Sequence, residues 1–150
     1  MIKIVFCLRR LPELSREEFQ TYWREQHAPL VLAHAEALGI RRYVQVHSID
    51  DAVSIAVAGP RQSPAPFDGV AELWLDSLDA LVAAGGSEAG RAASAALLDD
   101  ERRFIDLPRS PLFLAEEHVI IDGETASGGG RGRGTDGESG HASREHNESP

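Results

Sequence analysis

The chain has 150 residues, a formal net charge of −9 and one cysteine, Cys7. This length suits a single domain with a substantial core, and a lone cysteine excludes an intramolecular disulfide and is typical of a reducing compartment. The acidity argues against a nucleic-acid partner, and the chain shows neither a secretory signal pattern nor the long apolar run of a membrane span, so we expect a cytoplasmic protein.

The N-terminal part of the chain predicts a strand followed by a long capped helix. Met1–Arg10 carries apolar side chains at alternate positions, which is typical of a strand. Ser15 is a good N-cap, and Glu18, three residues later, completes a capping box. The helix that starts there should run to about Leu38 and end at Gly39.

A histidine lies on the apolar stripe of this predicted helix. The stripe recurs at three- and four-residue spacing and consists of Phe19, Trp23, His27 and Leu30. Pro29 has no N–H to donate, and its ring clashes with the preceding turn. We therefore expect the helix to kink or end beside His27.

Two strands follow, with a less regular segment between them. The strands are Ile40–Ser48 and Asp68–Leu75. Between them, Asp51–Ala58 could form a short helix, and the proline-rich residues 59–66 form a loop by composition.

A broken helix and a final strand complete the pattern. Ser77 can cap a helix from Leu78, and Gly85-Gly86 interrupts it before a second helical stretch runs from about 87 to 104. Leu112–Ile121 has the composition of a strand.

The resulting order, β-α-β-β-α-β, predicts an α+β, ferredoxin-like domain over residues 1–121 with a four-stranded antiparallel sheet. Its helices cover one face of the sheet, and the other face would be a large exposed apolar patch unless it were covered. Two such sheets meeting face to face in a homodimer would cover both. From Asp122 onward apolar residues nearly vanish, so residues 122–150 read as a disordered Gly/Ser/Glu-rich tail.

The helix motif is similar to that of a known family. Residues 19–31 read Phe-x-x-Tyr-Trp-x-x-x-His-x-Pro-Leu-Val, which resembles the EthD family of the dimeric α+β-barrel superfamily. The predicted strands fit the family as well, so the resemblance covers residues 1–121. It implies a dimeric α+β barrel, and its relatives perform several different reactions on small molecules.

Strand alternation suggests where a ligand could bind. If the aliphatic positions of each strand, including Val44 and Val46, pack on the helices, the opposite positions line the barrel interior. Titratable groups beside aromatic rings are the usual ingredients of a ligand site. The opposite positions hold such groups: Tyr43, Gln45, His47, Glu72, Trp74, Glu116 and His118.

Some of these side chains suit acid–base chemistry. His27 or His47 could act as the base, because a histidine pKa lies near working pH, and His27 is then expected at the mouth of the barrel. Tyr43 could donate to a substrate carbonyl or its enolate. The structural alternatives stay open, since His27 could cap carbonyls freed by Pro29. The candidate ligand contacts are Glu72, Trp74, Glu116 and His118.

The sequence suggests no metal and no cofactor. Its histidines lack a close pair such as His-x-x-x-His, and it has no glycine-rich phosphate motif and no Gly-x-Ser-x-Gly motif. With the resemblance, this favours a cofactor-independent isomerase, lyase or cyclase acting on a small hydrophobic or polyketide-like carbonyl compound. One alternative is a non-catalytic accessory or ligand-binding protein of an oxidative degradation pathway. Another is a haem-binding or cofactor-free monooxygenase-like barrel.

Overall fold

A computed structural model describes residues 1–123, and its elements follow the predicted order. In chain order they are β1 Ile2–Leu8, α1 Arg16–Tyr22, the π-helical turn η1 Trp23–His27, α2 Ala28–Leu38, β2 Arg42–His47, α3 Ala52–Ala58, the 3-10 turn η2 Gly59–Arg61, β3 Gly69–Leu75, α4 Leu78–Gly86, α5 Glu88–Glu101, the 3-10 turn η3 Leu107–Arg109 and β4 Leu112–Ala115. Of the predicted tail, residues 124–150 lie outside the described part. None of the helices within residues 1–123 has the length and apolarity needed to cross a membrane.

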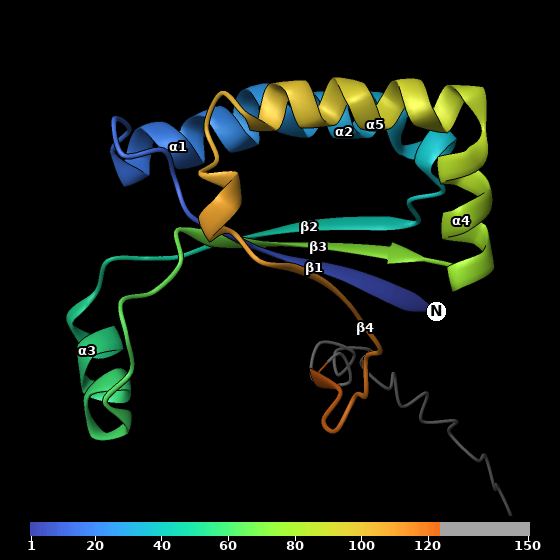
Figure 1. Cartoon of the computed structure of the whole chain (residues 1–150). Helices are drawn as coiled ribbons and strands as arrows, with labels where there is room; N and C mark the ends of the chain where they lie inside the picture. The colour runs from blue at the N-terminus through green and yellow to red at the C-terminus, as the bar shows by residue number, and fades with distance from the viewer. Residues whose placement is uncertain (124–150) are drawn as a thin grey trace, which may run out of the picture. The chain divides into compact units, whose positions relative to one another are not determined.

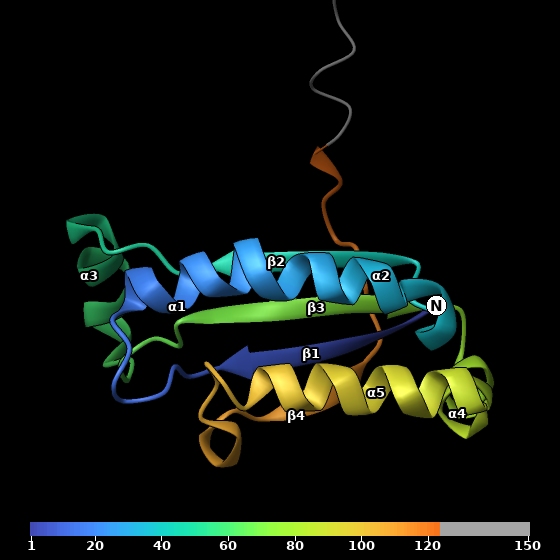
Figure 2. The same cartoon turned by 90° about the horizontal axis from the view of Figure 1, so that it is seen from above.

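The strands form one antiparallel sheet in the order β2-β3-β1-β4. Helices α1, α2 and α5 lie on one face of this sheet (Figure 1), and Figure 2 shows α1 and α2 running end to end beside α5. The prediction of an α+β, ferredoxin-like fold is confirmed. We call the other side of the sheet the open face; its residues include Lys3, Val5, Cys7, Val44, Val46, Val70, Glu72, Trp74 and Phe113.

The core between the sheet and the helices is rich in aromatic rings. Leu8, Phe19, Trp23 and Phe104 are at most 1% exposed. The ring centroid of Phe19 lies 5.7 Å from that of Trp23 and 5.5 Å from that of Phe104. These contacts join α1 and η1 to the turn that follows α5, so both helical segments are held rigidly over the sheet.

The long helix widens for one turn and does not end at Pro29. Its predicted capping box is present, with Ser15 and Glu18 bonding reciprocally. At η1 the N–H of Ala28 donates to the carbonyl of Trp23, five residues back. Pro29 then falls in the first turn of α2, where a missing N–H is tolerated. Of the kink or end expected beside His27, the end does not occur, and the helix continues through a π-helical turn.

The prediction of which β2 side chains face the helices is wrong. Tyr43 pairs with Leu73 and Gln45 with Ala71, and directly opposed residues share a face. Tyr43, Gln45 and His47 therefore face the helices, and the β2 valines lie on the open face. The reason is polar: under η1 the Tyr43 and Gln45 side chains find hydrogen-bond partners on Trp23.

The final strand is shorter than predicted. It ends at Ala115, which pairs with Lys3, and β1 itself begins at Ile2. Beyond this point an antiparallel partner has run out, so the chain leaves the sheet. Glu116 and His118 therefore lie beyond the end of β4, and both residues are exposed.

Candidate functional site

Tyr43 lies at the centre of a hydrogen-bonded chain beneath η1. Its hydroxyl oxygen accepts from Nε1 of Trp23 at 3.1 Å and from Nε2 of Gln45 at 3.0 Å. The same Gln45 nitrogen donates to the Trp23 carbonyl at 2.9 Å. A hydroxyl has two acceptor positions and one proton, so two bound donors leave the Tyr43 proton to be donated elsewhere.

His47 holds this chain in place from its far end. Its Nε2 lies 2.9 Å from Oε1 of Gln45. The Gln45 nitrogen donates to the Trp23 carbonyl, so the atom facing His47 is the amide oxygen, which can only accept, and Nε2 of His47 is the donor. The imidazole stacks on Trp23 with centroids 4.6 Å apart. Burial lowers the pKa of His47, and the charge of Arg24 lowers it further. A neutral His47 that donates to Gln45 positions Tyr43 and fixes the amide orientation of Gln45.

His27 lies between the helices and the sheet and is only 5% exposed. Its Nδ1 is 2.7 Å from Oδ2 of Asp100, and the Tyr22 hydroxyl donates to the other Asp100 oxygen at 2.6 Å. Burial lowers the pKa of His27, against the raising influence of Asp100. The expectation that His27 lies at the barrel mouth is wrong, because the apolar stripe that carries it packs inward; it does line a small cavity with Tyr43.

Two cavities between the sheet and the helices share part of their walls. The larger is about 250 Å³ and is lined almost entirely by aliphatic and aromatic side chains. The smaller is about 40 Å³ and includes both His27 and Tyr43. The walls common to the two are Phe6, Leu73, Leu97 and Glu101. An apolar chamber therefore adjoins a polar end.

Glu101, at the end of α5, brings a carboxyl group to both cavities. Burial raises its pKa to about 7, with repulsion from Asp100 adding and Arg102 opposing. Within residues 1–123, no hydrogen bond or ion pair engages this carboxylate. A carboxyl group that titrates near neutrality can both accept and return a proton. Burial raises the pKa of Tyr43, and the charge of Glu101 adds to this effect.

Glu72 and Trp74 lie on the open face, on the opposite side of the sheet from Tyr43 and Glu101. Nζ of Lys3 bonds to Glu72 and to Glu117, each at 2.9 Å. The same nitrogen lies 4.8 Å from the Trp74 ring, and Arg42 lies over that ring at 4.5 Å. These neighbours neutralise Glu72 and cover Trp74. Three of the sequence-predicted candidates, His27, Tyr43 and His47, thus lie together under the helices. Glu72 and Trp74 lie on the open face, and Glu116 and His118 lie beyond β4.

Sequence reasoning missed Glu101, although a signal was available. Ala93, Leu97 and Glu101 follow one another at four-residue spacing, and the first two are buried, so Glu101 continues the buried stripe of α5. The neighbouring Asp99 and Asp100 make this segment resemble a solvated acidic run, which obscures the buried position of Glu101. Among the described residues, no three His, Cys, Asp or Glu side chains gather to hold a metal ion.

Substitution of His27 should affect stability in proportion to what replaces the ring. His27→Ala removes the bond to Asp100 and the contact with Phe104, whose centroid is 5.1 Å away, and should lower the free energy of unfolding by about 2–4 kcal/mol. His27→Gln keeps a donor and should lose about 1 kcal/mol. Urea unfolding at pH 7.5 measures both, with the exposed His118→Ala as control. Equal stability of His27→Ala and the parent protein would contradict the buried contact.

The comparisons with known proteins agree with this fold. The EthD domain model matches residues 11–108. An EthD family protein from Bacillus halodurans superimposes with a TM-score of 0.53 at 20% identity, covering 79% of this chain and 99% of that one. An EthD-like protein from Ralstonia eutropha gives 0.51 at 18%, covering 80% and 95%.

A third similar structure is described as dimeric. This ferredoxin-like protein of unknown function from Bacteroides fragilis has a TM-score of 0.50 at 10% identity, covering 77% of this chain and 95% of that one. No curated protein matches the sequence. Because the EthD match spans well over half of the 150 residues, the protein belongs to the EthD family.

Proposed function

We propose that this protein is a cofactor-independent acid–base enzyme that binds a small, mostly apolar carbonyl compound between its sheet and its helices. The observation that carries this proposal is that Tyr43 and Glu101, whose pKa burial raises to about 7, both line the smaller cavity. An apolar chamber of about 250 Å³ beside them can hold the body of the ligand.

The proposed chemistry is proton transfer next to a carbonyl group. The Glu101 carboxylate removes a proton from the adjacent carbon, the C–H electron pair moves into the new C=C bond, and the carbonyl oxygen becomes an enolate. The Tyr43 proton holds that oxygen, and the two donors on its own oxygen strengthen the bond. Return of the proton from Glu101 to the same or another carbon closes the cycle without an oxidant.

This assignment changes the roles expected from the sequence. Glu101 takes the place of His27 or His47 as the base, and Tyr43 keeps its role as the donor. His47 acts through Gln45, and His27 supports the wall of the small cavity with Asp100.

We also propose that the protein works in the cytoplasm, because a reducing compartment suits its lone cysteine, Cys7.

We also propose that the protein is a homodimer in which two open faces meet. Half-exposed apolar side chains on this face support the proposal, including Val46 at 46% and Phe113 at 49% exposure. The dimeric character of the similar protein from Bacteroides fragilis supports it as well. Such a dimer would cover the Lys3–Glu72 pair and Trp74.

Deuterium exchange into 1-tetralone, a small bicyclic ketone, tests the proposed chemistry directly. The parent protein should speed exchange at the carbon beside the carbonyl in D₂O, followed by proton NMR. Tyr43→Phe should slow the catalysed exchange about 100-fold, and Glu101→Gln should reduce it to the buffer rate. Asp99→Asn, which removes a carboxylate on the same helix that is 72% exposed, should match the parent. Full activity in Glu101→Gln would refute its role as the base.

A further inference from the structure

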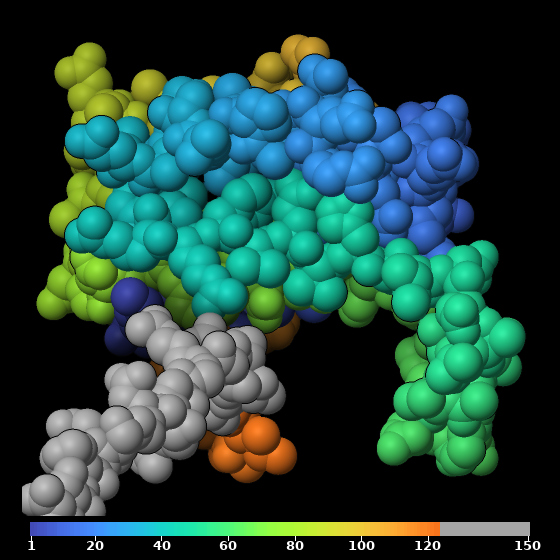
Figure 3. Space-filling view, turned by 180° about the vertical axis from the view of Figure 1, so that it is seen from behind, coloured from blue at the N-terminus to red at the C-terminus, as the bar shows by residue number. Residues whose placement is uncertain are grey.

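Residues 49–66, which join β2 to β3, form an arm with an exposed apolar helix. Its helix α3 reads Ala-Val-Ser-Ile-Ala-Val-Ala and contains no buried residue. Val53, Ile55 and Val57 are 68%, 75% and 56% exposed. Figure 3 shows the arm standing clear of the body of the domain.

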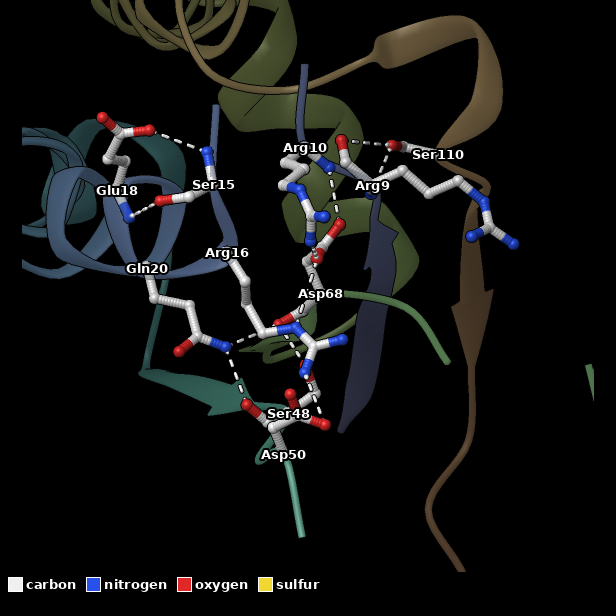
Figure 4. Close-up of polar contacts among 10 residues, drawn as sticks. All are labelled: Arg9, Arg10, Ser15, Arg16, Glu18, Gln20, Ser48, Asp50, Asp68 and Ser110. Atoms are coloured by element: carbon white, nitrogen blue, oxygen red, sulfur yellow. Dashed lines mark hydrogen bonds and ion pairs between the residues drawn. The ribbon is translucent and has the colours of Figure 1, made fainter. Parts of the chain in front are cut away.

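The arm leaves the domain from a firmly bonded base. Nε2 of Gln20 donates to the carbonyls of Ser48 and Asp68 at 2.8 and 3.0 Å, and Oγ of Ser48 donates to the same Asp68 carbonyl at 2.9 Å. Arg16 lies between two carboxylates, 3.8 Å from Asp50 and 3.6 Å from Asp68 (Figure 4). Where the arm begins and ends is therefore fixed by α1 and β3.

The arm also has its own caps, yet its apolar side chains lack a core to pack on. Asp51 accepts from the N–H of Val53 at 2.7 Å, and Arg61 donates to the carbonyl of Val57 at 2.6 Å. A helix of seven residues, rich in β-branched side chains, is not stable alone in water. Its stability must come from packing of its apolar face, and within residues 1–118 the hydrophobic core does not reach it.

The position of the arm indicates what covers it. Figure 1 shows α3 on the side of the sheet away from α1, α2 and α5, which is the side of the open face. The helix carries no charge, so its partner surface must be apolar. The open face is apolar as well, with Val46 and Phe113 exposed, and it lies on the same side of the domain as α3, where one second copy can cover both. A second copy brought face to face would place such a surface beside the arm.

We propose that the arm is a clasp that packs α3 onto the second copy of this chain. In a two-fold dimer the contact is reciprocal, so two arms embrace two domains. The inference rests on the homodimer of the proposed function and adds to it a specific locking element that leaves the site of Glu101 and Tyr43 unchanged.

Sedimentation equilibrium of the full chain tests the clasp. The double variant Val53→Asp/Ile55→Asp should raise the dimer dissociation constant about 100-fold, because each aspartate would be desolvated in the contact. Val82→Asp, at an equally exposed apolar position on α4, should leave the constant unchanged. A photo-crosslinking residue at position 55 should give a covalent dimer in the parent background.

The outcomes separate the clasp from the dimer and from the chemistry. Phe113→Asp on the open face should also dissociate the dimer. If it does so and the arm variant keeps the parent constant, the clasp is refuted and the sheet-to-sheet dimer stands. A monomeric parent protein would refute both. Tetralone exchange, measured on the same samples, reports on the proposed chemistry independently, and circular dichroism confirms that each variant is folded.

Discussion

Glu101→Gln should make the folded protein more stable at pH 8 by about 3 kcal/mol. The folded state raises the pKa of Glu101 from 4.5 to about 7, so it binds the proton more tightly than the unfolded chain does. That contribution to stability is present below pH 4.5 and is lost as the pH rises through 7. A glutamine has no proton to lose, and most of the difference between the two proteins should therefore disappear at pH 5.

Urea unfolding of both proteins at pH 5 and pH 8 makes this measurement. The comparison must be between proteins at each pH, because His27 has the opposite dependence: its pKa is lowered, so the fold loses stability as the pH falls below 6.5. Asp99→Asn serves as the control for the loss of an acidic residue from α5. A Glu101→Gln protein that is less stable than the parent at pH 8 would contradict the view that burial of the charged Glu101 carboxylate destabilises the fold.

Gly69→Ala should destabilise the fold by about 3 kcal/mol or more. A Cβ atom at this position would lie 2.4 Å from Cζ3 of Trp23 and 2.7 Å from the carbonyl oxygen of Val46. The backbone oxygen is held in the sheet and cannot move away. Trp23 would have to shift, and with it the donor to Tyr43, so catalysed tetralone exchange should also slow.

Gly85→Ala is the matched control for this substitution. The added Cβ would meet no atom within 4 Å, and alanine in a helix is favoured over glycine by up to about 1 kcal/mol. Thermal and urea unfolding of the two variants should therefore shift in opposite directions. A Gly69→Ala protein within about 0.5 kcal/mol of the parent would contradict the close packing of Trp23 on the sheet.

Local signals were sufficient to predict the elements of this fold. The Ser15–Glu18 capping box and Gly39, whose φ is +68°, fix the ends of the first helical segment. Pro29 correctly marked the turn at which the helix is irregular, but the helix does not end there, because a widened turn satisfies the backbone as well as a break does. The register of β2 depends on Gln45 bonding to the Trp23 carbonyl, and such a long-range contact leaves no trace in the alternation of a strand.

The candidate site could be predicted only in part, because it too depends on contacts between residues far apart in the sequence. Residue type and the family motif identified His27 and Tyr43, but their neighbours depend on how α5 packs against the first helix. Asp100 and Glu101 occupy successive positions, yet one bonds to His27 and Tyr22 and the other reaches the cavities. Only the packed structure distinguishes these two carboxylates.

A crystal structure of the protein with bound 1-tetralone is the most direct test of where the ligand lies. We expect the ketone oxygen within about 3 Å of the Tyr43 hydroxyl, the rings in the apolar chamber beside Leu73 and Leu97, and the carbon next to the carbonyl facing Glu101. Tetralone bound on the open face against Trp74, with the chamber between sheet and helices empty, would contradict this expectation.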